Sequence, residues 1–151
     1  MLPKWHILFG LIFSSLIYFF GIATITQTTI IFLASIFIDL DHYFRFVVIK
    51  KDLSPNNFWK WSMEAREKWL RLSPQEKSKL GARLFIFHNV EFLLLTFILT
   101  LFYFPAIFLL IGFLLHFIFD YIAMIKKSGH FLDKFSIFIL LKRNKKREEF
   151  G

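Results

Sequence analysis

Residues 36–46 read IFIDLDHYFRF, and this short stretch decides how the chain around it folds. Its apolar residues suit a membrane, yet the same stretch carries Asp39, Asp41, His42 and Arg45. An acidic or basic side chain at the centre of a membrane helix costs roughly 2.5–3.5 kcal/mol on insertion scales. These side chains therefore have to face the inside of a helical bundle or a water-filled cavity, where polar groups usually mark a functional site.

The rest of the chain is equally apolar. Of its 151 residues, 56% are hydrophobic and 23 are phenylalanine, whereas soluble domains are about 45–50% apolar. The chain has no cysteine, so a metal has to be held by His, Asp or Glu. The net charge is +8, and the basic residues cluster beside hydrophobic segments. We interpret this surplus as contact with anionic lipid headgroups and expect no nucleic acid as a partner.

The hydrophobic segments predict four membrane spans. Residues 7–38 contain no Asp, Glu, Lys or Arg and are too many for one span of about 20 residues, so the polar sequence TITQTT at 24–29 is predicted to divide a helical hairpin. Later in the chain, YFPA predicts a tight turn, with Pro105 opening the last span. The predicted spans are residues 6–23, 28–49, 84–103 and 105–125.

Two charged segments complete the predicted single membrane domain, which covers residues 1–151. Residues 50–83 predict a cytoplasmic amphipathic insert, whose first helix starts at Ser54 and Pro55. Such a basic helix with tryptophans suits the membrane surface, and packing on the protein's own core is the alternative. The basic tail, 128–151, contains an apolar part too short to span the bilayer, which predicts an interfacial C-terminal helix.

The predicted fold class is thus an all-α integral membrane protein: a four-helix transmembrane bundle with an amphipathic segment between spans 2 and 3. The distribution of charge gives its orientation. The loops at 24–29 and 103–105 lack charged residues, so all 19 Lys and Arg lie at the other ends of the spans. Because basic loops stay in the cytoplasm, we expect a multi-pass protein of the cell inner membrane with both termini cytoplasmic.

Polar residues from all four predicted spans lie at one depth. Counted from the outer ends of the spans, they lie roughly 16–25 Å into a hydrocarbon core about 30 Å thick. Three pairs also have the i, i+3 or i, i+4 spacing of one helix face: Asp39 with His42, His88 with Glu91, and His116 with Asp120. Imidazoles and carboxylates that converge from bundle helices are a known way to hold a metal. The predicted ligands are His6, Asp39, His42, His88, Glu91, His116 and Asp120.

The other polar residues near this layer have predicted roles around the metal. On a helix, Asp41 points away from Asp39 by about 160°, so it supports the ligands, binds a second metal or pairs with Arg45. We assign a catalytic role, as ligand or general base, to Asp41 and Glu91. Arg45 and Arg83 are candidates for binding a phosphate of the substrate. The expected cofactor is a divalent metal, Zn²⁺ or Mn²⁺, as one or two ions.

The order of these motifs resembles that of a known family. His6, the sequence DLDH at 39–42, His88 in HNVE, and HFIFD at 116–120 are similar to the pattern of the LexA-regulated, inner-membrane metal-dependent hydrolases of bacteria and archaea. The resemblance covers roughly residues 5–121. It implies a metal-dependent hydrolase that uses these residues as its site.

Three functions are compatible with these observations. The first is a membrane-embedded metal-dependent hydrolase at the cytoplasmic leaflet, acting on a phosphoester or a lipid-linked substrate. The alternatives are an ion- or proton-handling membrane protein and a non-enzymatic metal-binding scaffold. A relay needs polar steps across the whole membrane, and the outer halves of the spans offer only Gln27 and threonines. A catalytic metal site differs from a structural one in keeping an open coordination position.

Overall fold

A computed structural model of the chain describes residues 3–73, 76, 85–125 and 136–138. Within these residues the chain is helical and contains no strand, so the predicted all-α class is confirmed. The long helices are α1 (Pro3–Phe19), α2 (Ile25–Phe37), α3 (Leu40–Lys50), α4 (Pro55–Arg71), α6 (Val90–Phe102) and α7 (Ala106–Ile125).

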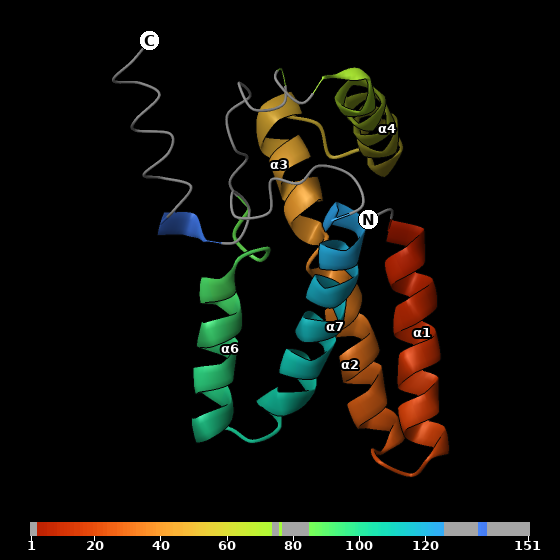
Figure 1. Ribbon diagram of the computed structural model, residues 1–151, viewed down its shortest axis with the longest axis vertical. Coiled ribbons are helices and arrows are strands. Elements are labelled where there is room, and N and C mark those ends of the chain that lie inside the picture. The colour runs from red at the N-terminus through yellow and green to blue at the C-terminus, as the bar shows by residue number, and fades with distance from the viewer. Residues whose placement is uncertain (1–2, 74–75, 77–84, 126–135, 139–151) are drawn as a thin grey trace.

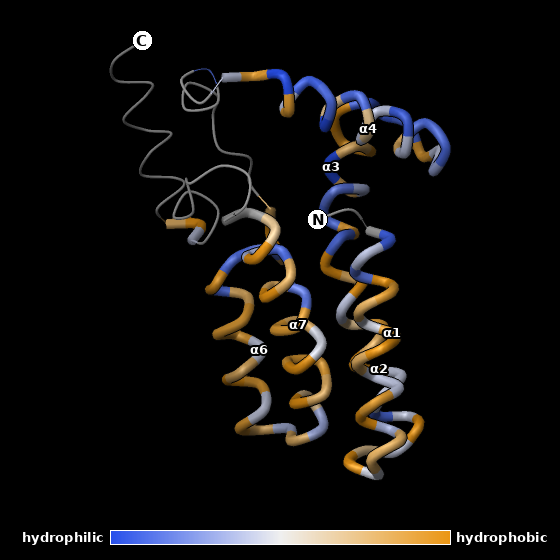
Figure 2. The backbone as a smooth tube through the Cα atoms, turned by 45° about the vertical axis from the view of Figure 1, so that its right-hand side comes forward, coloured by the Kyte–Doolittle hydropathy of each residue, from blue (hydrophilic) through white to orange (hydrophobic). Residues whose placement is uncertain are grey.

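Four of these helices, α1, α2, α6 and α7, form a bundle (Figure 1). Helix α7 is central, because it packs against α1, α2 and α6. The α1–α2 and α6–α7 turns lie at one end of the bundle, whereas the N-terminus, α3 and α4 lie at the other (Figure 1). Hydrophobic residues dominate the bundle, and hydrophilic ones are concentrated on α4 and on parts of α3 (Figure 2).

Small residues allow α2 to approach its two neighbours closely. A Cβ atom added to Gly112 of α7 would collide with the Ile31 carbonyl oxygen and lie only 2.6 Å from the Ala34 Cβ atom. A Cβ atom added to Gly10 of α1 would collide with the Ser35 hydroxyl. Small residues at helix crossings allow such contacts between backbones. The contacts bring α1 and α7 against α2, close to where α2 ends.

We expect Gly112→Ala to destabilise the bundle by about 1–3 kcal/mol, because an added methyl group in a packed crossing forces the helices to shift. Thermal unfolding in detergent measures the effect. The matched control is Leu114→Ala on the same helix, where the side chain is 42% exposed and the expected change is within about 0.5 kcal/mol. Equal melting temperatures for the two variants would show that α2 and α7 do not cross at Gly112.

The predicted second span, 28–49, is not one helix, because α2 ends and α3 begins within it. Between the two helices, the amides of Asp39, Asp41 and His42 donate to carbonyls three residues back, at 3.0, 3.2 and 3.1 Å. This tighter turn replaces the four-residue spacing of the α-helix. The prediction of one continuous helix was wrong because the apolar pattern runs through the turn without interruption.

The predicted turn at 24–29 is the start of α2. Thr24 caps this helix: its hydroxyl accepts a hydrogen bond from the Gln27 amide at 3.4 Å, and the Gln27 side-chain oxygen accepts one from the Thr24 amide at 2.8 Å. The chain turns earlier, at Gly21, whose φ of +68° suits glycine. The polar residues of this segment thus form a capping box rather than a loop.

Helix α6 begins later than the predicted third span, 84–103. Its N-cap is Asn89, whose side-chain oxygen accepts a hydrogen bond from the Phe92 amide at 2.8 Å. The residues just before the cap are irregular. His88 therefore lies outside the helix that carries Glu91, and the prediction that these two residues share a helix face was wrong.

Helix α7 has the length and hydropathy expected of a membrane span, over Ala106–Ala123, and it matches the predicted fourth span. Among the described residues, α7 is the only helix that is long and apolar enough to cross a membrane. The apolar helices Lys4–Phe19 in α1 and Val90–Phe102 in α6 are shorter. The predicted four-span bundle is therefore not confirmed.

Helix α4 lies across the polar end of the bundle, next to α3 (Figure 1). Its predicted start is confirmed, with Pro55 as the first residue and Ser54 as the cap that accepts from the Asn57 amide at 3.3 Å. The Ser54 amide and the Asn57 side chain both donate to the Asp52 carboxylate at 2.7 Å. These bonds favour the ionised form and hold the pKa of Asp52 below its usual value. Rings of α4 pack on Phe46 of α3.

Beyond α4, Ser73 and Glu76 form a second capping box, in which the Glu76 carboxylate accepts from the Ser73 amide at 2.7 Å and the Ser73 hydroxyl accepts from the Glu76 amide at 3.3 Å. Most of the insert after this point lies outside the described residues. So does the predicted tail, 128–151, apart from residues 136–138.

Candidate metal centre

Six histidine and aspartate side chains gather at the polar end of the bundle. They come from α1, the α2–α3 turn, α3, the segment before α6, and α7. Their ligand atoms form three overlapping groups, and within each group the atoms lie within 4.8 Å of one another. The groups are His6, Asp39 and His116; Asp39, His42 and His88; and His88, His116 and Asp120. The structure thus brings together all but one of the residues predicted as metal ligands.

His116 of α7 is fixed by a backbone carbonyl that the helix break makes available. In a continuous helix the Ser35 carbonyl would accept from the Asp39 amide, but that amide bonds to Ile36 instead. The Ser35 oxygen lies 2.8 Å from Nδ1 of His116, and the His116 side chain is completely buried. Because a carbonyl only accepts hydrogen bonds, Nδ1 carries the proton and Nε2 presents a lone pair to the cluster.

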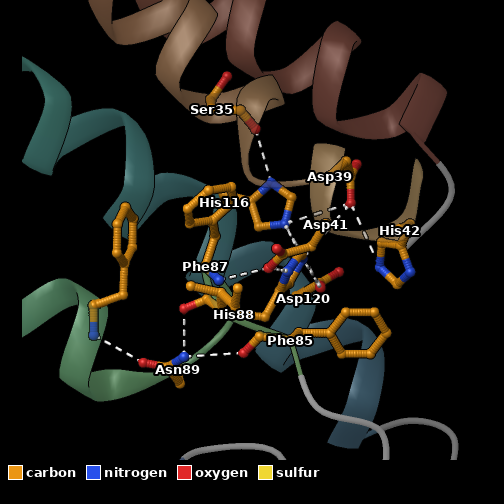
Figure 3. Close-up of polar contacts among 12 residues, drawn as sticks. Ser35, Asp39, Asp41, His42, Phe85, Phe87, His88, Asn89, His116 and Asp120 are labelled. Carbon is orange, nitrogen blue, oxygen red and sulfur yellow. Dashed lines mark hydrogen bonds and ion pairs between the residues drawn. The ribbon is translucent and has the colours of Figure 1, made fainter. Parts of the chain in front are cut away.

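His88 is fixed in a similar way by Asp41 (Figure 3). One Asp41 oxygen accepts from the Phe87 amide at 2.5 Å and lies 3.3 Å from Nδ1 of His88. The Asp41 side chain is only 6% exposed. A carboxylate that accepts from Nδ1 leaves Nε2 as the free nitrogen of the ring. Asp41 therefore lies behind His88 and orients it, which favours the supporting role among the three predicted for this residue.

The Nε2 atoms of these two imidazoles and one oxygen each of Asp39 and Asp120 form a group of four acceptor atoms (Figure 3). The Nε2 atoms of His88 and His116 lie 3.2 Å apart. Asp39 Oδ1 lies 3.7 Å from His88 Nε2 and 3.8 Å from His116 Nε2. Asp120 Oδ2 lies 3.9 Å and 3.7 Å from the same two nitrogens. When both rings are neutral, each of these atoms offers a lone pair, because the ring protons point outward to Ser35 and Asp41.

Four lone pairs at this spacing repel one another unless a positive charge lies between them. The spacing also matches that of metal ligands. Zinc lies about 2.0–2.2 Å from nitrogen and oxygen, so ligand atoms around a tetrahedral ion are about 3.3–3.6 Å apart. The five separations that involve the two imidazole nitrogens, 3.2 to 3.9 Å, are close to this range. These four residues can therefore hold a metal ion with small adjustments of their side chains.

His6 and His42 lie at the border of this group of four. His6 is buried, its Nε2 atom lies 3.2 Å from Asp120 Oδ1, and its ring stacks on His116 at 3.9 Å between centroids. His42 Nε2 lies 3.9 Å from Asp39 Oδ1. The cluster is open to solvent at His42 and Asp120, since the His42 side chain is 44% exposed and that of Asp120 is 30% exposed.

The structure does not bring Glu91 to the cluster. Its carboxylate accepts hydrogen bonds from the Ser136 hydroxyl and, at 3.2 Å, from the Ile137 amide. Glu91 thus connects α6 to the segment that follows α7. Of the two arginines predicted to bind phosphate, Arg45 is half-buried on α3 and Arg83 lies outside the described residues. Phosphate binding by these arginines stays a prediction.

Two supporting groups of the site were missed by sequence reasoning, namely the carbonyl of Ser35 and the amide of Phe87. Both belong to the backbone, which every residue type carries, so no sequence signal could have indicated them. Knowledge of the break between α2 and α3 would have indicated the Ser35 carbonyl, because the break releases this carbonyl from its helical hydrogen bond.

Comparison with known proteins gave no match to a family model, to a curated protein or to a solved structure. The resemblance to inner-membrane hydrolases therefore stays a prediction, and function has to be inferred from the geometry of the cluster.

Proposed function

We propose that this chain is a membrane-embedded, metal-dependent hydrolase, with the metal held by Asp39, His88, His116 and Asp120. The observation that carries the proposal is the pair of imidazoles with their Nε2 atoms 3.2 Å apart, each fixed from behind with its lone pair turned inward. Two carboxylates complete the set of acceptors. Such a donor set, with nitrogen and oxygen but no sulfur, suits Zn²⁺ or Mn²⁺.

The residues around the metal have distinct tasks in this proposal. A divalent ion in such a site lowers the pKa of a bound water to about 7 and polarises a phosphoryl or acyl oxygen. Asp41 keeps the His88 ring turned toward the ion through Nδ1. His6 holds the second oxygen of Asp120, which leaves Asp120 Oδ2 directed at the two free imidazole nitrogens. Three of the four ligands, His88, His116 and Asp120, are thus oriented by a partner behind them, as preorganised metal sites require.

The open side of the cluster favours catalysis over a purely structural metal. Structural zinc sites are closed by four protein ligands, whereas catalytic sites keep a position for water or substrate. Here His6 and His116 are buried, while His42 and Asp120 border solvent. Substrate is proposed to enter from this side.

The surface of the bundle supports a location in a membrane. Large apolar side chains are exposed along α1, α6 and α7, far beyond the isolated ones that soluble proteins show. They include Leu11, Ile12, Leu16, Leu94, Leu95, Phe97, Leu101, Leu114 and Ile118. The polar end carries the cluster, α3 and α4 (Figure 2). We therefore propose a multi-pass protein of the inner membrane, with the site and both termini on the cytoplasmic side.

This placement supports a substrate that reaches the site from the membrane surface. Helices α2 and α6 have 13 residues each, so they extend about 20 Å from their turns to the level of the cluster. That level lies within the cytoplasmic half of a hydrocarbon core about 30 Å thick. A phosphoester, small or lipid-linked, is the proposed substrate, and anionic headgroups are the proposed lipid partners of the basic segments.

A hydrolysis assay on the detergent-purified chain tests the proposal. With bis(4-nitrophenyl) phosphate as the probe, we expect turnover that a chelator abolishes and that Zn²⁺ or Mn²⁺ restores. Asp120→Asn should be inactive, whereas Asp52→Asn, which changes an exposed carboxylate next to α4, should keep wild-type activity. A chain that binds metal but hydrolyses neither phosphoesters nor acyl esters would contradict the proposal and would favour a scaffold.

Asp41→Ala is expected to weaken metal binding about 10- to 100-fold, which is the usual effect of removing a group that orients a metal ligand. The variant leaves His88 Nδ1 and the Phe87 amide without their acceptor. Asp41→Asn retains an oxygen in the same place and should recover part of the affinity. Competition with a fluorescent zinc chelator gives the affinities. If both variants bound metal as tightly as the wild type, Asp41 would have no part in positioning His88.

A further inference from the structure

The cluster offers more ligands than one tetrahedral ion takes. A tetrahedral zinc ion has four ligands, and six side chains gather here. Two of the three groups of ligand atoms share a single residue, Asp39. One consists of Asp39 with His6 and His116, and the other of Asp39 with His42 and His88. Together they use each of the four clustered histidines once, which gives two sets of two imidazoles with one shared carboxylate. The third group, His88, His116 and Asp120, spans both sets.

The two oxygens of Asp39 suit this division. Oδ1 lies 3.7 to 3.9 Å from the Nε2 atoms of His42, His88 and His116. Oδ2 is buried and has no hydrogen-bond partner among the described residues. A buried carboxylate oxygen without a partner is costly, and a cation bound to it would remove that cost. The Nδ1 atom of His6, whose ring stacks on that of His116, is also buried without a hydrogen-bond partner among the described residues.

Asp120 lies across both sets. Its Oδ1 atom is 3.2 Å from Nε2 of His6, and its Oδ2 atom is 3.7 Å from Nε2 of His116 and 3.9 Å from Nε2 of His88. One carboxylate thus faces histidines of both sets with its two oxygens. The Nε2 atoms of His88 and His116 lie only 3.2 Å apart. Ions bound one to each of them would therefore be neighbours, as in two-metal sites, whose metals lie about 3.5–4 Å apart.

We propose that the site binds two divalent ions side by side, one at His6 and His116 and the other at His42 and His88, with Asp39 and Asp120 shared between them. This inference rests on the proposed function and extends it: His88 and His116 become ligands of neighbouring ions, and His6 becomes a ligand as well as a partner of Asp120. The position at His42 is the more exposed one, so its ion should exchange faster. Two divalent cations against two shared carboxylates leave an excess of positive charge. The paired site therefore favours a phosphoester, which is anionic, over a neutral acyl ester.

Metal stoichiometry of the full chain in detergent tests this inference. After loading with Zn²⁺ or Mn²⁺ and gel filtration, we expect two ions per wild-type chain and one for both His42→Ala and His6→Ala. Glu91→Gln is the matched control and should keep two, because its carboxylate bonds to Ser136 and Ile137 instead. One ion in the wild type that His42→Ala leaves in place would overturn the paired site but not the proposed function. No bound ion at all would overturn both.

Electron paramagnetic resonance of the Mn²⁺-loaded protein gives a second readout, and its decisive spectrum is that of the wild type. Two ions about 3.5–4 Å apart are expected to give the broad spectrum of coupled manganese. At equal loading, His42→Ala should give the six-line spectrum of an isolated ion. An uncoupled six-line spectrum in the fully loaded wild type would contradict the shared carboxylates.

Discussion

Asp39→Ala is expected to leave the protein without bound metal, which is the largest effect of any single change. Asp39 Oδ1 lies within 3.9 Å of three histidine nitrogens, and its second oxygen is buried without a partner. Losing such a ligand should lower the metal affinity by more than the 10- to 100-fold that is lost when a residue supporting a ligand is removed. The helix turn does not depend on the side chain, because Asp39 makes no capping hydrogen bond to α3. Metal content of the purified protein by mass spectrometry measures the effect.

Two controls separate this effect from general damage to the fold. The variant should elute as the wild type does on gel filtration and retain its helical circular dichroism. Glu91→Gln removes another charge, at the start of α6, and should bind the full amount of metal. A folded Asp39→Ala protein that still bound as much metal as the wild type would place the metal elsewhere in the chain.

The second large effect concerns how the chain crosses the membrane. Because the sequence contains no cysteine, single cysteines can be introduced without a background. Ile22→Cys and Phe104→Cys lie exposed at the α1–α2 and α6–α7 turns, and Asn56→Cys lies exposed on α4. A membrane-impermeant maleimide should label the two turn variants in intact spheroplasts. It should label Asn56→Cys only after the membrane is opened.

This labelling pattern follows from the absence of charge in the two turns and from the basic residues at the other end of the bundle. The three sites act as controls for one another, because each is exposed in the structure. Labelling of all three from outside would contradict a bundle that crosses the membrane. Labelling of Asn56→Cys alone in intact spheroplasts would invert the proposed orientation.

The gathering of the histidines could be predicted because it depends on depth and not on local conformation. A polar group in an apolar segment has to face the bundle interior, and residues at one depth on neighbouring helices then meet. His88 shows that a prediction from depth can hold even where the predicted helix is wrong. It was predicted on a helix and lies instead in the irregular segment before Asn89, yet it still reaches His116, at 3.2 Å between Nε2 atoms.

Predictions that depended on exact helix boundaries were less successful. Glu91 was paired with His88 by helical spacing, and the Asn89 cap removes that relation by starting the helix between them. The turn after α2 was also missed, because Ile38 and Leu40 continue the apolar pattern through it. Hydropathy measures the burial of side chains, whereas a helix break is a matter of backbone hydrogen bonds.

The helix break gives Asp39 and Asp41 their different surroundings. Asp39 lies in the turn itself and faces the open cluster, whereas Asp41 lies in the first turn of α3 and bonds to the segment before α6. Periodicity predicted that the two carboxylates diverge on one continuous helix. In the structure the helix is broken, and the two carboxylates approach opposite nitrogens of the same His88 ring. Periodicity could not show which residues Asp41 contacts, because Phe87 and His88 are 46 and 47 residues away along the chain.

X-ray absorption spectroscopy of the zinc-loaded protein tests most directly whether this cluster is a metal site. We predict nitrogen and oxygen neighbours at about 2.0–2.2 Å, no sulfur, and the outer scattering of about two imidazoles per ion. The same preparation of Asp39→Ala should retain no zinc. Zinc bound without imidazole scattering, or no zinc retained by the wild type after gel filtration, would show that the His and Asp side chains at the polar end of the bundle do not form a metal centre.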